Sequence, residues 1–203
     1  MKLFHSPSSP YVRKVMVLLH ELGRIDAVTL EIVSTTVLEP SKALTAGNPL
    51  SKIPALERPD GPTLYDSRVI CAYLDDRFQG GLYPANHARW DVLTLEATAD
   101  GIMDCAVNMA YELRLRPEEK RFDQWLEAQW GKVSRAVSAL DARWMSHLRG
   151  PRDMGHIAVA CALGYLDLRH DARNWRKGND ALAAWFAEFD SRPAMLATRP
   201  PAA

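Results

Sequence analysis

Two serines that each stand at the predicted start of a helix are the residues best suited to chemistry in this sequence. Ser9 precedes Pro10, and proline is common at the first position of a helix. Ser67 follows Asp66 where an apolar helical pattern begins. A helix start offers unpaired N–H groups and a positive potential, so it suits either a capping side chain or a bound anion. On local sequence alone, capping is the commoner role for Ser9, whereas at Asp66 and Ser67 the two roles can coexist.

Short apolar runs separated by turn residues predict an α/β domain in the first 80 residues. Asp60-Gly61 between two apolar runs is a strong hairpin signal. The predicted order is βαβ, then an irregular stretch, then ββα. Its elements are a strand at Lys2–His5, a helix at Tyr11–Leu22, a strand at Val28–Val33, hairpin strands at Ile53–Glu57 and Thr63–Tyr65, and a helix at Ser67–Phe78.

Apolar residues recur at spacings of three and four from Arg89 onward, which predicts a helical second domain. One stripe begins at Val92, and a second runs from Phe122 to Leu148. We expect these two long helices to pack antiparallel across the break at Arg116-Pro117. Residues 157–166 are apolar on nearly all sides, as expected for a helix at the centre of a bundle, and a last helix stops at Arg192-Pro193. The predicted division is therefore a domain at 1–80, a linker at 81–88 and an all-helical domain at 89–203.

Composition excludes several classes of function. Lys plus Arg and Asp plus Glu balance at 25 each, so no overall field attracts nucleic acid or an anionic membrane. Cys71, Cys105 and Cys161 are widely separated and lie among apolar residues, which argues against a disulfide framework and a zinc cluster. No apolar run suits a signal peptide or a membrane span. We expect a cytoplasmic protein without a metal site that binds a small neutral or zwitterionic ligand.

Three motifs on this domain pattern resemble the cytosolic glutathione transferase superfamily. They are Ser8-Ser9-Pro10-Tyr11-Val12-Arg13-Lys14, Asn48-Pro49-Leu50-Ser51-Lys52-Ile53-Pro54-Ala55-Leu56 and Leu64-Tyr65-Asp66-Ser67. Each is weak alone, but the three in this order and spacing are fairly specific. The resemblance covers essentially the whole chain and is closest to small bacterial members with serine at the active position. It implies a thioredoxin-like N-terminal domain followed by an all-α C-terminal helical bundle.

The resemblance implies a glutathione S-transferase active in detoxification, with glutathione as co-substrate and no tightly bound cofactor. The hydroxyl of Ser9 would donate a hydrogen bond to the glutathione sulfur, and the resulting thiolate would attack a small hydrophobic electrophile. Ser8 is the alternative, because one residue of misalignment exchanges the two hydroxyls. The active residue of the family directly precedes the pair that matches Pro10-Tyr11, which favours Ser9.

The other two motifs would hold the rest of glutathione, again by resemblance. A cis Ile53–Pro54 bond would turn the backbone of Ile53 toward the cysteinyl part of the tripeptide. Lys52 would meet the glycyl carboxylate. The alternative, that Lys52 is an exposed surface lysine that contacts no ligand, is equally compatible with the sequence. Ser67 would hold the γ-glutamyl carboxylate and Asp66 its ammonium group.

The electrophile and the partner subunit are also implied by the resemblance. The pocket for the electrophile would be bounded by Tyr11 and by the long helix that carries Asp104, Met109, Tyr111 and Arg114. A homodimer is the expected assembly. The composition of the pocket residues does not identify the electrophile.

The sequence departs from the family at the start of the central helix of the second domain. Relatives carry a Ser/Thr-x-x-Asp capping box where this chain has Asp153-Met154-Gly155-His156. Asp153 can still cap, but His156 replaces the carboxylate that would bond back, which predicts weaker local stability. We expect His156 to be a surface or capping residue, because no second histidine lies at metal-binding spacing.

The sequence is also compatible with two alternative functions. The same fold can serve as a non-catalytic binding or regulatory protein, because a fold does not guarantee chemistry. A glutathione-dependent thiol reductase is disfavoured, because Ser9 stands where such relatives carry cysteine and a hydroxyl cannot form a mixed disulfide.

Overall fold

The computed structural model describes residues 1–201, which form two compact units. The first unit comprises Met1–Pro84 and Pro193–Pro201, and the second comprises Ala85–Arg192. The break between Pro84 and Ala85 falls within the segment 81–88 predicted as the linker. The return of Pro193–Pro201 to the first unit differs from the predicted division, which assigned every residue after 88 to the helical domain.

A four-stranded mixed sheet lies at the centre of the first unit, with the strand order β2-β1-β3-β4. β1 pairs parallel with β2 and antiparallel with β3, and β3 pairs antiparallel with β4. The predicted βαβ-ββα order of a thioredoxin-like domain is confirmed. The strands are β1 (Lys2–His5), β2 (Thr29–Ile32), β3 (Ala55–Arg58) and β4 (Gly61–Leu64).

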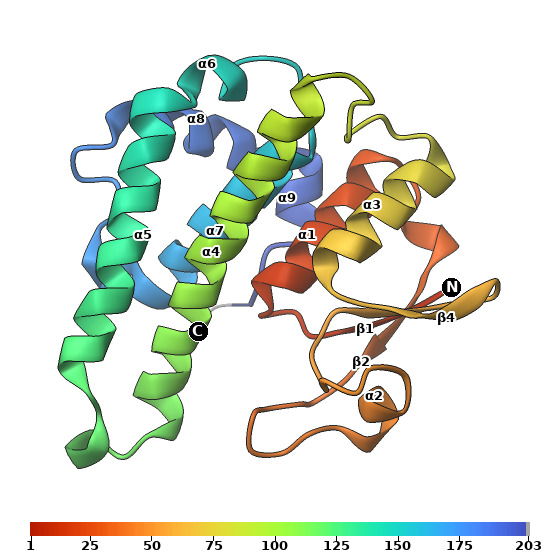
Figure 1. Cartoon of the computed structure of the whole chain (residues 1–203), viewed down its shortest axis with the longest axis horizontal. Helices are drawn as coiled ribbons and strands as arrows, with labels where there is room; N and C mark the ends of the chain where they lie inside the picture. The colour runs from red at the N-terminus through yellow and green to blue at the C-terminus, as the bar shows by residue number, and fades with distance from the viewer. Residues whose placement is uncertain (202–203) are drawn as a thin grey trace. The chain divides into compact units, whose positions relative to one another are not determined.

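Helices cover both faces of this sheet. α1 (Pro10–Glu21) and α3 (Ser67–Phe78) lie side by side on one face, and α2 (Lys42–Gly47) lies on the other (Figure 1). A 3-10 turn at Ile25–Ala27 leads into β2. α2 occupies the stretch predicted as irregular, because six residues are too few to show a helical period.

A short C-terminal helix, α9 (Pro193–Ala197), packs on α1 and thereby joins the end of the chain to the first unit. The buried guanidinium of Arg13 donates a hydrogen bond to the carbonyl of Met195 at 3.1 Å. The sequence predicted only a helix end at Arg192-Pro193. Proline instead opens a new helix there, where its missing N–H needs no partner.

The second unit is entirely helical in its described part. α7 (Met154–His170) is buried along most of its length and packs against α4 (Ala88–Leu115) and α8 (Asp180–Asp190), as predicted for the central helix of a bundle. α4 also packs beside α5 (Asp123–Arg143), and the two run antiparallel (Figure 1). The remaining elements are α6 (Met145–Leu148) and 3-10 turns at Glu118–Lys120 and Asp171–Arg173.

Two details of the second long helix were predicted wrongly. The apolar stripe extended to Leu148, but α5 ends at Arg143 and α6 begins at Met145. Neither glycine nor proline marks this break, so the pattern contains no signal for it. Phe122, assigned to the buried stripe, precedes α5 and is 58% exposed.

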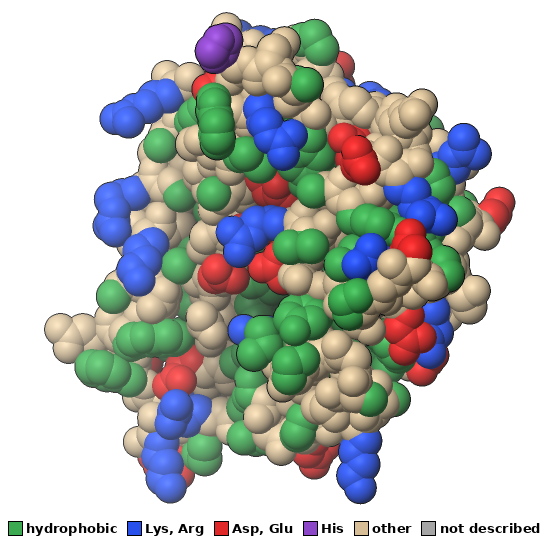
Figure 2. All heavy atoms as spheres, turned by 45° about the vertical axis from the view of Figure 1, so that its right-hand side comes forward, with side chains coloured by type: hydrophobic (Ala, Val, Ile, Leu, Met, Phe, Trp, Pro, Cys, Tyr) green, Lys and Arg blue, Asp and Glu red, His purple; other side chains and the backbone are tan. Residues whose placement is uncertain are grey.

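The surface agrees with the balanced composition. Lys and Arg side chains lie interspersed with Asp and Glu on the face that Figure 2 displays, without an extended region of one sign. Among residues 1–201, no helix combines the length and the apolar character that a membrane crossing needs.

Candidate functional site

Ser9 is the N-cap of α1. Its backbone is extended, with φ −82° and ψ 122°, and its Oγ accepts a hydrogen bond from the backbone N–H of Val12 at 3.3 Å. The residue is half-buried. A hydroxyl that accepts a hydrogen bond keeps its own O–H for donation. The predicted capping role is thus confirmed, and it leaves a donor at the positive end of the helix.

The neighbouring hydroxyl of Ser8 has a different environment. Its Oγ lies 3.5 Å from the Oγ of Ser6, and Ser8 is also half-buried. The N–H of Ser9 donates to the carbonyl of Ser6 at 3.1 Å, which closes the turn that leads into α1. Ser9 is therefore the serine that caps α1.

The peptide bond between Ile53 and Pro54 is cis, as predicted from the second motif. Pro54 is buried, Ile53 packs against a cluster formed by Phe4, Val33, Leu44 and Ala55, and Lys52 is exposed. β3 begins at Ala55, so the backbone of Ile53 lies just ahead of the strand ladder.

Asn48 organises the loop before this cis bond. Its buried side chain donates from Nδ2 to the carbonyl of Lys52 at 2.8 Å and accepts at Oδ1 from the N–H of Leu50 at 3.0 Å. The hydroxyl of Thr35 donates to the carbonyl of Ser51 at 3.3 Å, and the φ angle of Ser51 is +50°. Sequence reasoning assigned no role to Asn48; an asparagine between Gly47 and Pro49, a typical turn composition, was the available signal.

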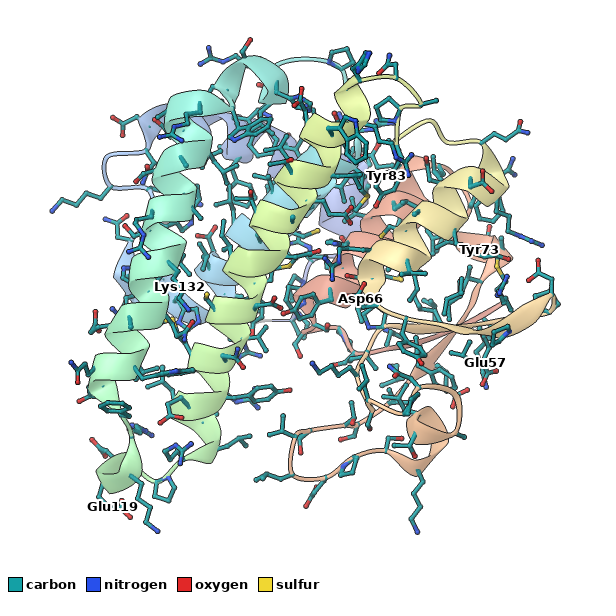
Figure 3. All side chains as sticks on the ribbon, viewed as in Figure 1. Glu57, Asp66, Tyr73, Tyr83, Glu119 and Lys132 are labelled. Atoms are coloured by element: carbon teal, nitrogen blue, oxygen red, sulfur yellow. The ribbon has the colours of Figure 1, made fainter. Side chains whose placement is uncertain are left out.

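Asp66 lies at the start of α3 (Figure 3), and Ser67 follows it as the first residue of that helix, as predicted. Asp66 is the N-cap and accepts at Oδ1 from the N–H of Arg68 at 3.0 Å, while the guanidinium of Arg68 donates to Oδ2 at 3.1 Å. Ser67 is the first residue of the helix and is 2% exposed. The peptide bond between Tyr65 and Asp66 is cis.

Two cations set the charge state of Asp66. Partial burial acts to raise the pKa of its carboxyl, but the hydrogen bonds and charge of Arg68, together with the charge of Lys14, hold that pKa below its usual value. Lys14 lies on α1 and is fully buried. A lysine is almost never fully buried without a partner, so a lysine within the apolar pattern of α1 was the signal that sequence reasoning missed.

The residues predicted for the electrophile come from two elements of different units. Tyr11 is half-buried in the first turn of α1. On α4, Asp104 and Arg114 are exposed, Tyr111 is half-buried and Met109 is fully buried. Met109 therefore presents no side-chain surface to a ligand in this conformation.

The start of α7 differs from the prediction in two respects. The capping box is complete, because Asp153 accepts at Oδ1 from the N–H of His156 and the Nδ1 of His156 accepts from the N–H of Asp153, both at 3.3 Å. His156 is 2% exposed, so it is a capping residue rather than a surface one. His147 from α6 lies against the same aspartate, a proximity that sequence spacing did not reveal.

All three cysteines are buried. They lie in α3, α4 and α7, whereas the serines of the first motif precede α1. Burial raises the pKa of the Cys105 thiol, with a lowering influence from Lys132 and a raising one from Asp104. A thiol exchange centre needs an accessible thiolate, which this environment disfavours.

Comparison with known proteins identifies relatives over the full chain. Residues 3–81 match the N-terminal domain family of glutathione S-transferases, and residues 123–188 match the C-terminal domain family. A glutathione transferase family member from Pseudomonas fluorescens Pf-5, solved with bound glutathione, is 52% identical over 98% of each chain, with a TM-score of 0.96.

Two further matches extend this result. A structure from the same organism with bound S-(propanoic acid)-glutathione is 50% identical over 99% of this chain and 100% of the other, with a TM-score of 0.92. The uncharacterized GST-like protein YibF of Escherichia coli K12 is 30% identical over the whole of both chains. With a thioredoxin-like sheet, a helical second unit and matches in both domains, the chain belongs to the cytosolic glutathione S-transferase superfamily.

Proposed function

We propose that this protein binds glutathione, stabilises its thiolate through Ser9 and conjugates it to small hydrophobic electrophiles. The observation that carries the proposal is the hydroxyl of Ser9 at the N-terminus of α1, where it caps the helix by accepting and can still donate. Binding of glutathione is supported by the relative that holds it at 52% identity. S-(propanoic acid)-glutathione in a second relative is a ligand substituted on sulfur, the type of product that conjugation yields.

The available interactions are strong enough for this role. Lowering the pKa of a thiol from about 8.5 by two units requires about 2.7 kcal/mol. A hydrogen bond to a charged group supplies about 1.5 to 3 kcal/mol. The positive end of α1 adds about 0.3 to 1 kcal/mol. Ser9 therefore acts as a hydrogen-bond donor to sulfur and need not take up a proton.

The other motifs hold the two ends of the tripeptide in this proposal. The backbone of Ile53, set by the cis bond to Pro54, pairs with the cysteinyl part like an added strand. The exposed ammonium of Lys52 meets the glycyl carboxylate. Ser67 and the free N–H groups at the start of α3 bind the γ-glutamyl carboxylate, and Asp66 binds its ammonium.

The ionised form of Asp66 is the one that this binding mode requires. Arg68 and Lys14 favour that form. Arg68 also competes for the carboxylate, so we expect its exposed side chain to move aside when the ammonium group of glutathione binds.

The remaining assignments follow from the family. We propose that the electrophile is bound by Tyr11, Asp104, Met109, Tyr111 and Arg114. Met109 would contact it only after a change of conformation. We further propose a homodimer in the cytoplasm with a role in detoxification. Sedimentation velocity at micromolar protein tests the assembly, and a monomer there would contradict it.

Calorimetry and turnover test the proposed activity. We expect wild-type protein to bind glutathione and to conjugate a generic aryl halide, and Ser9→Ala to retain binding with a much lower rate. Equal rates for the two proteins would remove Ser9 from the mechanism. Absence of binding at millimolar glutathione would instead support a non-catalytic role for the fold. Disulfide reduction that depends on a cysteine would support the thiol reductase.

A further inference from the structure

The start of α7 brings together three side chains that the proposed glutathione chemistry does not use. His147 comes from α6, Asp153 is the N-cap of α7, and His156 lies three residues into that helix. One potential ligand atom from each lies within 4.8 Å of the others. We propose that these residues form a binding site for a divalent transition metal of the Zn²⁺ type.

The donor set favours this class of ion. Imidazole nitrogen is a ligand for zinc, copper, nickel and cobalt, whereas magnesium and calcium take oxygen ligands almost exclusively. Two histidines and one carboxylate also match the three protein ligands of many zinc sites that keep a fourth position for water. Tetrahedral zinc of this kind is the ion to which the geometry points.

The distances require only a small adjustment. His147 Nε2 lies 2.6 Å from Asp153 Oδ2, and His156 Nδ1 lies 2.8 Å from Asp153 Oδ1. Bonds of about 2.0 to 2.2 Å to a tetrahedral ion separate neighbouring ligand atoms by about 3.4 Å. Each histidine nitrogen therefore moves away from its nearest carboxylate oxygen by less than about 1 Å, and the two nitrogens, which lie within 4.8 Å of each other, approach by at most about 1.4 Å. His147 binds the ion through Nε2 as the neutral ring protonated at Nδ1, so the proton that Nε2 shares with the carboxylate is transferred by way of solvent to Nδ1.

The environment holds the ligands in place on one side and is open on the other. The side chains of His156 and Asp153 are 3% and 12% exposed, whereas that of His147 is 20% exposed. Trp185 and Phe189 pack against His156, and Trp144 packs edge-on against His147. An ion can therefore enter past His147 and retain a water ligand on that side.

A capping role alone leaves one feature of His156 unexplained. Its Nε2 is buried and has no hydrogen-bond partner within residues 1–201. Burying an imidazole at a cap is unfavourable when one of its nitrogens is left unsatisfied. Coordination through Nδ1 needs an imidazole ring, so a metal site accounts for histidine in place of the usual capping carboxylate, whereas Nε2 stays unpaired in either case.

Electrostatics opposes the ion in part. The N-terminus of α7 carries a positive potential, which disfavours a cation nearby. The carboxylate of Asp153, which lies between the two imidazoles, offsets that potential.

The experiment is a titration of full-length, chelator-treated protein with Zn²⁺, followed by calorimetry and by the melting temperature. His147→Gln is the informative variant, because its amide can still donate to Asp153 while it is a poor metal ligand. His87→Gln changes an exposed histidine ahead of α4 and is the matched control. Co²⁺ in place of Zn²⁺ reports tetrahedral coordination through its visible absorption.

We expect wild type and His87→Gln to bind one equivalent of Zn²⁺ and to melt at a higher temperature with it. His147→Gln should bind more than about tenfold more weakly while melting normally without metal. Lack of saturable binding to wild type would overturn the site, as would equal binding to His147→Gln. Either result would leave the three residues as a helix cap and nothing more.

Discussion

Within residues 1–201, Asp66 and Asp153 are the two aspartates at helix N-caps, and they differ in what surrounds them. Asp66 begins α3 with a side chain that is 57% exposed and pairs with the equally exposed Arg68. Asp153 begins α7 with a side chain that is 12% exposed and lies between His147 and His156. The same residue type at the same helix position therefore remains available to a ligand in the first unit and is occupied by protein groups in the second.

The two N-caps differ in how much stability the protein loses when the partner of the aspartate is removed. Solvent can replace Arg68 at Asp66, so that ion pair adds little to stability. Water does not reach Asp153 as easily, so removal of its carboxylate leaves the Nε2 of His147 and the backbone N–H of His156 without the partner they have in the folded protein. We expect Asp66 to matter mainly for binding and Asp153 mainly for folding.

Asp153→Ala should have the largest effect on stability. The change removes a helix cap and the shared partner of two histidines, so we expect the free energy of unfolding to fall by about 3 kcal/mol. Urea unfolding at 25 °C, in the presence of a metal chelator, measures this free energy. Asp66→Ala is the matched variant, with an expected loss of about 1 kcal/mol. Equal losses would contradict the distinction between the two caps.

The decrease in the free energy of unfolding at acidic pH should depend on Asp153. Its pKa is lower in the folded protein than in the unfolded chain, so it stabilises the fold above about pH 3.9, the unfolded value. That contribution is lost as the pH falls through the folded pKa. Asp153→Asn should therefore flatten the stability curve below about pH 4 relative to wild type. If the free energy of unfolding of Asp153→Asn decreases below about pH 4 as steeply as that of wild type, other groups control the acid dependence.

Asp66→Asn should separate binding from folding. Asparagine caps a helix nearly as well as aspartate, so the free energy of unfolding should change by less than about 0.5 kcal/mol. Loss of the negative charge should raise the KM for glutathione about tenfold, because a charge-assisted hydrogen bond contributes about 1.5 kcal/mol or more. Asp153→Asn is the control, with KM unchanged. The reverse pattern would assign the ligand to the other cap.

Lys52→Ala should have the smallest effect. The side chain is exposed, and solvent-exposed ion pairs contribute about 0 to 1 kcal/mol, so the KM for glutathione should rise less than about fivefold. Lys42→Ala, on α2, provides a surface lysine for comparison. An increase well beyond tenfold for Lys52→Ala would make this lysine a principal anchor of the glycyl end.

The elements with strong local signals were predictable from sequence. β1 and α3 have the bounds predicted for them, because a short apolar run and an Asp-Ser cap mark their ends. The cis bond at Pro54 followed from a motif. α2 is too short to show a period, and α9 depends on packing against α1, so neither had a local signature.

The parts of the sites that depend on distant residues were not predictable. Lys14 acts on Asp66 across two helices, and His147 meets His156 only because α5 ends at Arg143 and the chain turns into α6. The spacing of residues along the sequence does not indicate such contacts. The hydroxyl of Ser9 was correctly placed at a helix start, while its assignment to a sulfur comes from the family resemblance and stays a proposal.

The thiol pKa of bound glutathione tests the central claim most directly. It is read from thiolate absorbance in a pH titration of wild type, Ser9→Ala and Ser8→Ala. We predict a value below the ordinary thiol pKa of about 8.5 for wild type and Ser8→Ala. Ser9→Ala should raise it by about 1 to 2 units, the equivalent of one charge-assisted hydrogen bond. An unchanged pKa in Ser9→Ala, or a rise confined to Ser8→Ala, would contradict the assignment of Ser9.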